Sequence, residues 1–309
     1  MGIEFKSTKE AAGSRQGIFY GAISFIAWGL LPLYWKLLKQ VPAQEILAHR
    51  IFWSFIFVSA LILIKGDLGR IRTAITNRKN MLLIVIASIL ISVNWFTYIW
   101  AVNSDYVLQA SLGYYINPLV VSILGILVFK ERFDRAQIIA LLLAFIGVLL
   151  LTIQYGRIPW VALILAVTFA LYGMVKKLLK VDSVIGLALE TMTIAPIALA
   201  FIIFREGQGV GSIGLLPIST LLFLFMSGIA TATPLLWFAK GTQLVEFSTI
   251  GFLQYISPTI SMLLGIFVFR EAFTSVHAIS FGFIWTALVI YTVSKARAMK
   301  PKETLKIEY

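Results

Sequence analysis

One segment of this chain occurs twice. The stretch YINPLVVSILGILVFKERF at residues 115–133 returns as YISPTISMLLGIFVFREAF at residues 255–273, 140 residues later and without a gap. The matches include prolines, glycines and glutamates as well as apolar residues, whereas two unrelated apolar segments would match only in Leu, Ile and Val. The chain is therefore a duplication. Its period of about 140 residues is too long for a solenoid repeat and is typical of internally duplicated membrane proteins.

The composition places both copies in a membrane. Hydrophobic residues make up 60% of the chain and charged residues 13%, with a mean hydropathy of +0.92, against roughly 45–50% and about 25% in soluble domains. A helix needs roughly 20 apolar residues to cross the hydrocarbon core. Ten runs reach that length, and we expect each to be a membrane span: 17–38, 44–64, 81–101, 106–129, 135–154, 158–176, 184–204, 215–239, 246–269 and 275–294.

The runs divide equally between the copies. We expect an all-α integral membrane protein with a cytoplasmic N-terminal tail (1–16), a first five-helix repeat (17–154), a second five-helix repeat (158–295) and a cytoplasmic C-terminal tail (296–309). A transmembrane β-barrel would instead show roughly ten-residue segments of alternating hydropathy, which these continuous runs are not.

The net charge of +12 comes from basic residues near the ends of the spans. With the N-terminus inside, the cytoplasmic ends would carry Lys6, Lys9, Arg15, Lys65, Arg70, Arg72, Arg78, Lys79, Lys130, Arg132, Arg135, Lys176, Lys177, Lys180, Lys240, Lys295, Arg297, Lys300, Lys302 and Lys306. That is 20 of the 26 Lys and Arg residues, so the positive-inside rule predicts that both termini are cytoplasmic. Because the basic residues are spread over many short loops, we expect no nucleic-acid partner.

An odd number of spans in each copy requires the second copy to be inverted relative to the first. The loop charges agree with this inversion. Lys130, Arg132 and Arg135 correspond in the second copy to Arg270, Ala272 and Ser275, so two of the three positive charges are lost where inversion places that loop outside.

Several strings in the first half resemble a known family. They are WGLLPLYWK (28–36), HRIFWS (49–54), NWFTYIWAVN (94–103) and LGYYINPL (112–119). With them the chain, from about residue 17 to residue 295, is similar to the RarD branch of the EamA family in the drug/metabolite transporter superfamily. The resemblance implies a bacterial inner-membrane transporter with two inverted five-helix repeats around a central substrate cavity. It implies no catalytic motif, and it does not identify a substrate.

The duplicated prolines indicate where such a cavity would lie. Pro118 and Pro258 fall near the middle of the fourth and ninth spans, and a proline frees a backbone carbonyl that is tolerated at membrane depth only beside protein or water. We expect a pair of broken helices lining the cavity, although a packing kink would leave the same sequence signature. The predicted lining is Trp28, Asn94, Tyr98, Tyr115, Asn117, Pro118, Tyr172, Trp237, Gln254, Tyr255, Ser257 and Pro258.

Ionisable residues inside the spans are costly and therefore informative. Glu190 lies in the seventh span, and its counterpart in the first copy is His49, which precedes Arg50 in the second span. Glu190, His49 and Arg50 are candidates for proton coupling. The structural alternatives are satisfaction of the polar group within the local helix, or snorkelling to the outer surface for His49 and Arg50. For Glu131 and Glu271 we expect ion pairs with the adjacent Lys130 and Arg270, and for His277 an interfacial position.

We expect no catalytic residues, no metal site and no cofactor. The chain has no cysteine and only two histidines, which are not in metal-ligand spacing. The glycines at 209, 211 and 214 spell Gly-x-Gly-x-x-Gly, but without a preceding strand they do not indicate a nucleotide site. The favoured function is secondary transport of a small organic metabolite or drug by alternating access, and export is favoured over import. A lipid scramblase or channel, and a lipid-modifying enzyme, are the alternatives.

Overall fold

The computed structural model describes residues 2–104, 106–268, 270 and 274–298, so the predicted C-terminal tail lies largely outside the described residues. In the described part every regular element is an α-helix. The first repeat holds α1 (Gly2–Lys36), α2 (Ala43–Lys65), α3 (Leu68–Thr76), α4 (Arg78–Asn103), α5 (Val107–Leu127) and α6 (Arg135–Tyr155). The second repeat holds α7 (Trp160–Leu178), α8 (Ser183–Gly207), α9 (Ser212–Leu215), α10 (Ile218–Leu244), α11 (Phe247–Gln254), α12 (Ile256–Phe267) and α13 (Ser275–Ala298).

The ten predicted spans are confirmed. Ten helical stretches of the described residues are long and apolar enough to cross a membrane, with α11 and α12 together forming the ninth, and the short α3 and α9 lie outside them. Asn77 caps the start of α4 by accepting hydrogen bonds from the N–H groups of Lys79 and Asn80, at 3.0 and 3.1 Å. Asp134 and Gln137 form a capping box at the start of α6.

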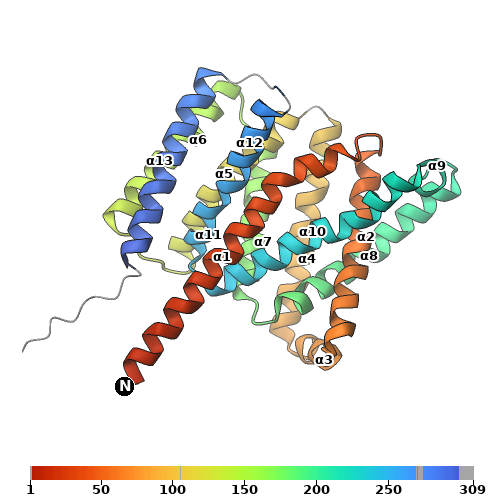
Figure 1. Cartoon of the computed structure of the whole chain (residues 1–309), viewed down its shortest axis with the longest axis horizontal. Coiled ribbons are helices and arrows are strands. Elements are labelled where there is room, and N and C mark those ends of the chain that lie inside the picture. The colour runs from red at the N-terminus through yellow and green to blue at the C-terminus, as the bar shows by residue number, and fades with distance from the viewer. Residues whose placement is uncertain (1, 105, 269, 271–273, 299–309) are drawn as a thin grey trace, which may run out of the picture.

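The all-α fold of two inverted five-helix repeats is likewise confirmed. Helices with equivalent places in the two repeats pack against each other: α6 against α13, α5 against α11 and α2 against α8. Figure 1 shows the first pair at one side of the molecule and the last at the other. Because four spans lie between the members of each pair along the chain, the two members cross the membrane in opposite directions. Lys130 and Arg270, which are counterparts, share a left-handed backbone with φ of 54° and 57°.

We call the end of the bundle at which α1 ends and α2 begins the distal end. The opposite end is the proximal end, where α1 starts and α13 finishes, both towards the lower left in Figure 1. Consecutive spans alternate between the two ends, so α4, α6, α8 and α12 finish at the distal end. α2, α5, α7, α10 and α13 start there.

Close helix contacts rely on small residues. A Cβ at Gly228 of α10 would overlap the backbone of Trp53 in α2, and Ser54 donates a hydrogen bond to the Gly228 carbonyl at 2.9 Å. A Cβ at Gly147 of α6 would lie 2.7 Å from the carbonyl oxygen of Ser280 in α13. Lipid supplies no hydrophobic force between helices, so such close backbone approach is a main source of their association.

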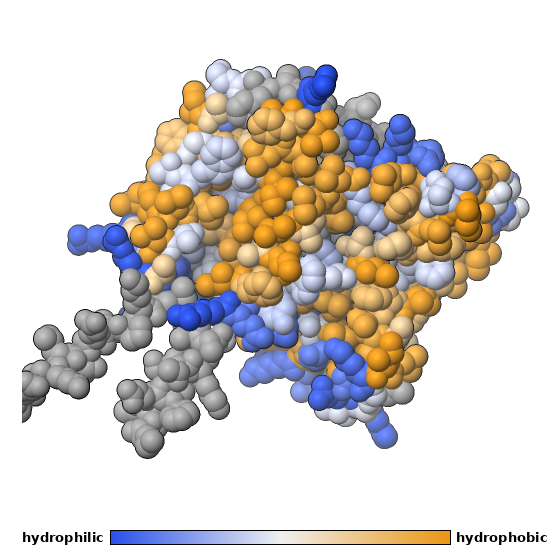
Figure 2. Space-filling model, in the orientation of Figure 1, coloured by the Kyte–Doolittle hydropathy of each residue, from blue (hydrophilic) through white to orange (hydrophobic). Residues whose placement is uncertain are grey.

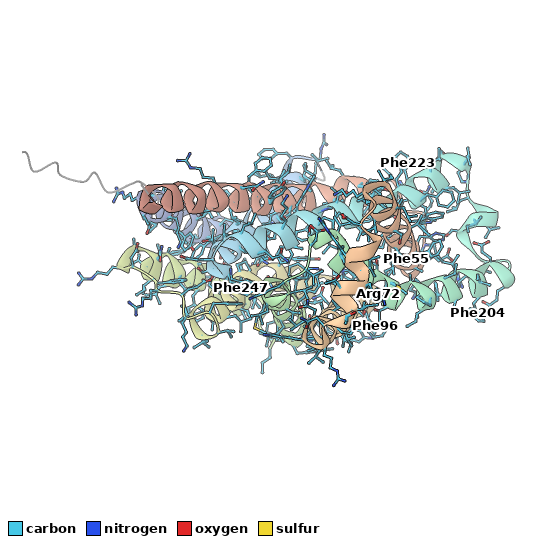
Figure 3. All side chains as sticks on the ribbon, turned by 90° about the horizontal axis from the view of Figure 1, so that it is seen from below. Phe55, Arg72, Phe96, Phe204, Phe223 and Phe247 are labelled. Atoms are coloured by element: carbon cyan, nitrogen blue, oxygen red, sulfur yellow. The ribbon has the colours of Figure 1, made fainter. Side chains whose placement is uncertain are left out.

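The outer surface is apolar in the middle. Figure 2 shows apolar residues across this face, with hydrophilic residues gathered towards its lower and upper edges. Phe96 and Phe204 are 68% and 61% exposed, whereas Phe247 is fully buried between helices; all three are labelled in Figure 3. Exposed side chains of this size would be a liability in water and suit contact with lipid tails.

Candidate functional site

A cavity of about 920 Å³ lies between the repeats. Its wall takes residues from α1, α2, α4, α5 and α6 of the first repeat and from α7, α10, α11, α12 and α13 of the second. The wall includes Gln154 and Tyr155 in the last turn of α6 and His277 in the first turn of α13, so the cavity extends to the distal end. Its size falls within the range of small-molecule sites.

Many of the predicted residues meet at this cavity. The structure places these predicted residues on its wall: Trp28, Arg50, Asn94, Tyr98, Tyr115, Asn117, Gln254, Ser257 and Pro258. Sequence reasoning missed Trp35, Trp95, Tyr114, Phe169 and Thr231, which also line it. Trp35, Trp95 and Tyr114 lie inside the strings that carry the family resemblance, and their place in those strings is the feature of the sequence that could have identified them as wall residues. Phe169 and Thr231 had no such feature, because nothing in an apolar span distinguishes them.

Two asparagines on the wall also hold helices together. The Asn94 amide donates hydrogen bonds to the Leu165 carbonyl and the Thr168 hydroxyl, each at 2.9 Å. The Asn117 amide donates to the carbonyl of Ala166. These bonds join α4 and α5 of the first repeat to α7 of the second. Both N–H groups of the Asn94 amide are thus engaged, and one of the two on Asn117 is bonded. The groups left for a ligand are the side-chain oxygens of both residues and the second N–H of Asn117.

The paired helix break is found in one repeat only. In the second repeat the helix is interrupted at Tyr255, three residues before Pro258, which separates α11 from α12. In the first repeat α5 continues through Pro118. The Pro118 carbonyl accepts a hydrogen bond from the Ser122 hydroxyl at 2.8 Å, whereas the carbonyl that the proline leaves without its helical donor is that of Tyr114, four residues earlier. The prediction of a broken α5 is therefore wrong.

Four predicted wall residues lie elsewhere. Pro118 is at the contact of α5 with α11, where a Cβ on Gly251 would meet its carbonyl oxygen. Tyr255 is buried among Phe252 and other residues of an apolar cluster. Trp237 is half-buried on α10, outside the cavity wall. Tyr172 is fully buried and turned towards α8, where its hydroxyl donates to the Glu190 carboxylate at 3.1 Å.

Glu190 forms an ion pair rather than facing the cavity. Its carboxylate lies 2.7 Å from the ammonium of Lys176, and both side chains are 1% exposed. Lys176 is therefore not the loop charge that we expected, but the partner that neutralises Glu190. A buried charge in a span is costly unless it is paired in this way. The pair joins α7 to α8, so Glu190 is neutralised by a neighbouring helix rather than satisfied within its own.

The side chains of His49 and Arg50 point away from α2 in different directions and line different cavities. The His49 ring is buried and its Nδ1 accepts a hydrogen bond from the Trp53 indole at 3.3 Å. It lines a second, smaller cavity of about 430 Å³, together with Glu206 at the end of α8. Arg50 instead lines the large cavity, with its guanidinium carbon 4.6 Å from the ring centre of Trp95 and 5.8 Å from that of Trp35. Neither side chain snorkels to the surface.

Contacts between the repeats close the proximal end. The Glu131 carboxylate, in the first repeat, accepts hydrogen bonds from the N–H groups of Phe247 and Ser248, at the start of α11. Asp134 accepts one from Ser294 of α13. Lys240 of α10 donates to the Tyr20 hydroxyl of α1 at 2.9 Å. The expected pairing of Glu131 with Lys130 is replaced by this cap on α11, and Glu271 lies outside the described residues.

Two segments of the chain match one known protein family. Residues 15–153 and residues 157–293 each match the EamA-like transporter family. The chain belongs to this family. As an EamA-like protein it is a membrane transporter of the drug/metabolite class, and it is a multi-pass protein of a bacterial membrane.

The relatives of this EamA-like transporter match along nearly their whole length. It is 48% identical to an uncharacterized transporter, YojE, of Bacillus subtilis, over 93% of this chain and 96% of the relative. It is 38% identical to protein RarD of Escherichia coli, over 92% and 96%. A solved structure titled "Crystal structure of protein" matches with a TM-score of 0.68 at 19% identity, over 92% of this chain and 99% of that one, which supports the fold alone.

Proposed function

We propose that this transporter is a secondary carrier that exports a small organic metabolite or drug by alternating access, with both termini in the cytoplasm. The observation that carries the proposal is the cavity of about 920 Å³ between the repeats, which extends to the distal end. At the proximal end Glu131, Asp134 and Tyr20 of the first repeat are bonded to the second repeat. One open end and one closed end are what an alternating-access carrier requires.

The orientation and the direction of transport have separate support. The concentration of Lys and Arg residues at the proximal side of the sequence favours a cytoplasmic proximal end. The cavity would then face outward in this conformation, where an exporter releases its substrate. Export is also the direction that the likeness to drug/metabolite transporters favours. In this proposal the substrate crosses chemically unchanged, so the protein is not an enzyme.

Proton coupling is a further part of the proposal, and the geometry changes its candidates. Protonating Glu190 would leave the buried Lys176 charge without its partner, which is costly. Arg50 keeps its proton at any physiological pH. His49 is the remaining candidate, because its ring lies in the smaller cavity beside Glu206 and histidine titrates near neutrality.

Counterflow in proteoliposomes tests the carrier proposal. Vesicles are loaded with an unlabelled candidate solute, and the uptake of the labelled solute is followed with and without a pH gradient. A carrier gives saturable uptake that the internal solute accelerates. Uptake that rises linearly and is not accelerated supports a channel, and transbilayer movement of labelled phospholipid supports a scramblase.

A further inference from the structure

Arg50 is a charge without a counter-ion on the wall of the cavity. Among the described residues that line the cavity there is no Asp, Glu or Lys, so Arg50 is its one permanent charge. It takes part in none of the ion pairs formed by the described residues. The nearest acidic residue on its own helix, Glu45, is bound to Arg205 at 3.1 Å and to the N–H of Ser212 at 2.8 Å.

The aromatic groups around Arg50 do not replace a counter-ion. Its guanidinium lies against Trp95 and Trp35, and the titratable groups that interact with its charge are Tyr98 and Tyr114. Phenols are neutral at physiological pH. The Nε of Arg50 is buried and has no hydrogen-bond acceptor among the described residues. A buried donor on a charged group is expensive to leave unsatisfied, so a ligand that satisfies it is strongly favoured.

A second set of unsatisfied polar atoms lies deeper in the same cavity. The Thr231 hydroxyl, and both amide atoms of Gln254, are buried without a partner among the described residues, and both side chains line the cavity. The hydrogen bond from Ser54 of α2 to Gly228 of α10 shows that these two residues lie at the same height along the bundle. Arg50 is four residues on the distal side of Ser54, and Thr231 is three residues on the proximal side of Gly228. At 1.5 Å per residue the two groups are about 10 Å apart along the bundle.

We propose that the cavity binds an organic anion. Its carboxylate or phosphate would be bound by Arg50, its flat apolar body would lie among the aromatic side chains of the wall, and a hydrogen-bonding group at its other end would meet Thr231 and Gln254. A cation is disfavoured because it would be desolvated beside Arg50 with no acidic residue of the described wall to pair with. That the bound anion is the transported substrate rests on the proposed function. Binding of the anion can be measured without transport.

Calorimetric titration of the purified protein in detergent tests the site with four probes of one skeleton: 3-phenylpropionate, its amide, 3-phenylpropylamine and 2-phenylethyl phosphate. We expect at least one of the two anions to bind ten-fold or more tightly than the amide and the amine. Which anion binds more tightly distinguishes a carboxylate from a phosphate substrate. Binding of the amide or the amine as tightly as both anions overturns the proposal, and this comparison needs no variant.

Variants then assign the preference to Arg50. Arg50→Gln should lose the preference for the anion while still binding the amide, and Arg50→Lys should keep part of it. Lys39→Gln removes an exposed charge near the same end of the bundle and is the matched control, which should behave like the unmodified protein. An unchanged preference in Arg50→Gln overturns the assignment, and size-exclusion profiles confirm that each variant is folded.

Counterflow separates this inference from the carrier proposal. If an anion binds as expected but no solute shows counterflow, the anion site stands and the carrier function fails. If a neutral or cationic solute shows counterflow while neither anion binds, the carrier function stands and the anion site fails.

Discussion

Glu131 of the first repeat caps a helix of the second: its carboxylate accepts a hydrogen bond of 2.9 Å from the N–H of Ser248, in the first turn of α11. A carboxylate at a helix N-terminus satisfies free N–H groups and interacts favourably with the helix dipole. The contact spans the two repeats at the proximal end, so in the proposed alternating-access cycle we expect it to break when that end opens. Glu131 therefore stabilises the conformation with the proximal end closed.

The first prediction follows from this cap. Glu131→Ala should remove about 1–2 kcal/mol from the closed conformation, which is the usual loss for a helix cap and corresponds to a five- to thirty-fold shift towards opening. The readout is the substitution Ser122→Cys, at a buried position on α5 against α11, in this cysteine-free chain. Labelling of the introduced thiol by a water-soluble maleimide should be faster in the Glu131 variant.

A matched control tests whether any lost cap has this effect. Glu206 caps the short α9 at the distal end, with the N–H of Ile213 at 2.7 Å, and both residues are in the second repeat. Glu206→Ala should leave the labelling of the thiol introduced by Ser122→Cys unchanged. Equal labelling rates with Glu131 intact and with Glu131→Ala would refute the role given to Glu131.

The second prediction concerns the buried pair of Lys176 and Glu190. Removing one partner should leave an uncompensated charge, so Lys176→Met alone should cost about 3–5 kcal/mol of stability. Glu190→Gln alone should cost a similar amount. The double variant Lys176→Met with Glu190→Gln should be more stable than either single variant. Thermal unfolding in detergent measures the three, and a double variant as unstable as the sum of its parts would show that the pair is not coupled.

The third prediction concerns the helix contact at Gly228. A Cβ there overlaps the backbone of Trp53, so Gly228→Ala should push α2 and α10 apart and destabilise the protein by about 1–3 kcal/mol. Gly282 lies within α13 with no neighbouring atom close to the place of a Cβ, and Gly282→Ala is the control. By helix propensity alone it should be neutral or slightly stabilising. A similar melting temperature for both variants would contradict the close contact.

The fourth prediction concerns access to the cavity. A cysteine introduced by Ser257→Cys, on the cavity wall, should react with small charged thiol reagents added at the distal side. A cysteine introduced by Leu142→Cys should not react, because Leu142 is 57% exposed on the apolar outer face of α6 and the lipid excludes charged reagents. The reaction rate of the Ser257→Cys variant should fall when a transported solute is present. Inert behaviour at both positions would mean that the cavity is sealed.

The fifth prediction concerns orientation. Arg72 and Arg157 are exposed, near the proximal and distal ends respectively. In intact cells, a cysteine in place of Arg157 should be labelled by a membrane-impermeant reagent, and one in place of Arg72 only after the membrane is broken. The reverse pattern would place both termini outside the cell, and the cavity would then open to the cytoplasm instead of to the outside.

Some properties of this protein are local in the sequence and could be predicted from it. The length of each apolar run predicts a span, and the repeat at residues 115 and 255 predicts two equivalent halves. The odd number of spans in each half then predicts the inversion. The same reasoning placed Asn94, Gln254 and Ser257 at the cavity, because polar groups at membrane depth need protein or water nearby.

Other properties were decided by the tertiary structure alone. A span is apolar both towards lipid and towards its neighbours, so its sequence does not reveal which face meets the cavity. Phe169 faces the cavity, whereas Tyr172, one turn later on α7, faces Glu190. The sequence alone suggests that Lys176 is a loop charge. In the folded protein, the packing of α7 on α8 pairs it with the Glu190 carboxylate. Arg50 is left unpaired in the cavity for the same reason, since the partner of a buried charge is chosen by helices that meet only in the folded bundle.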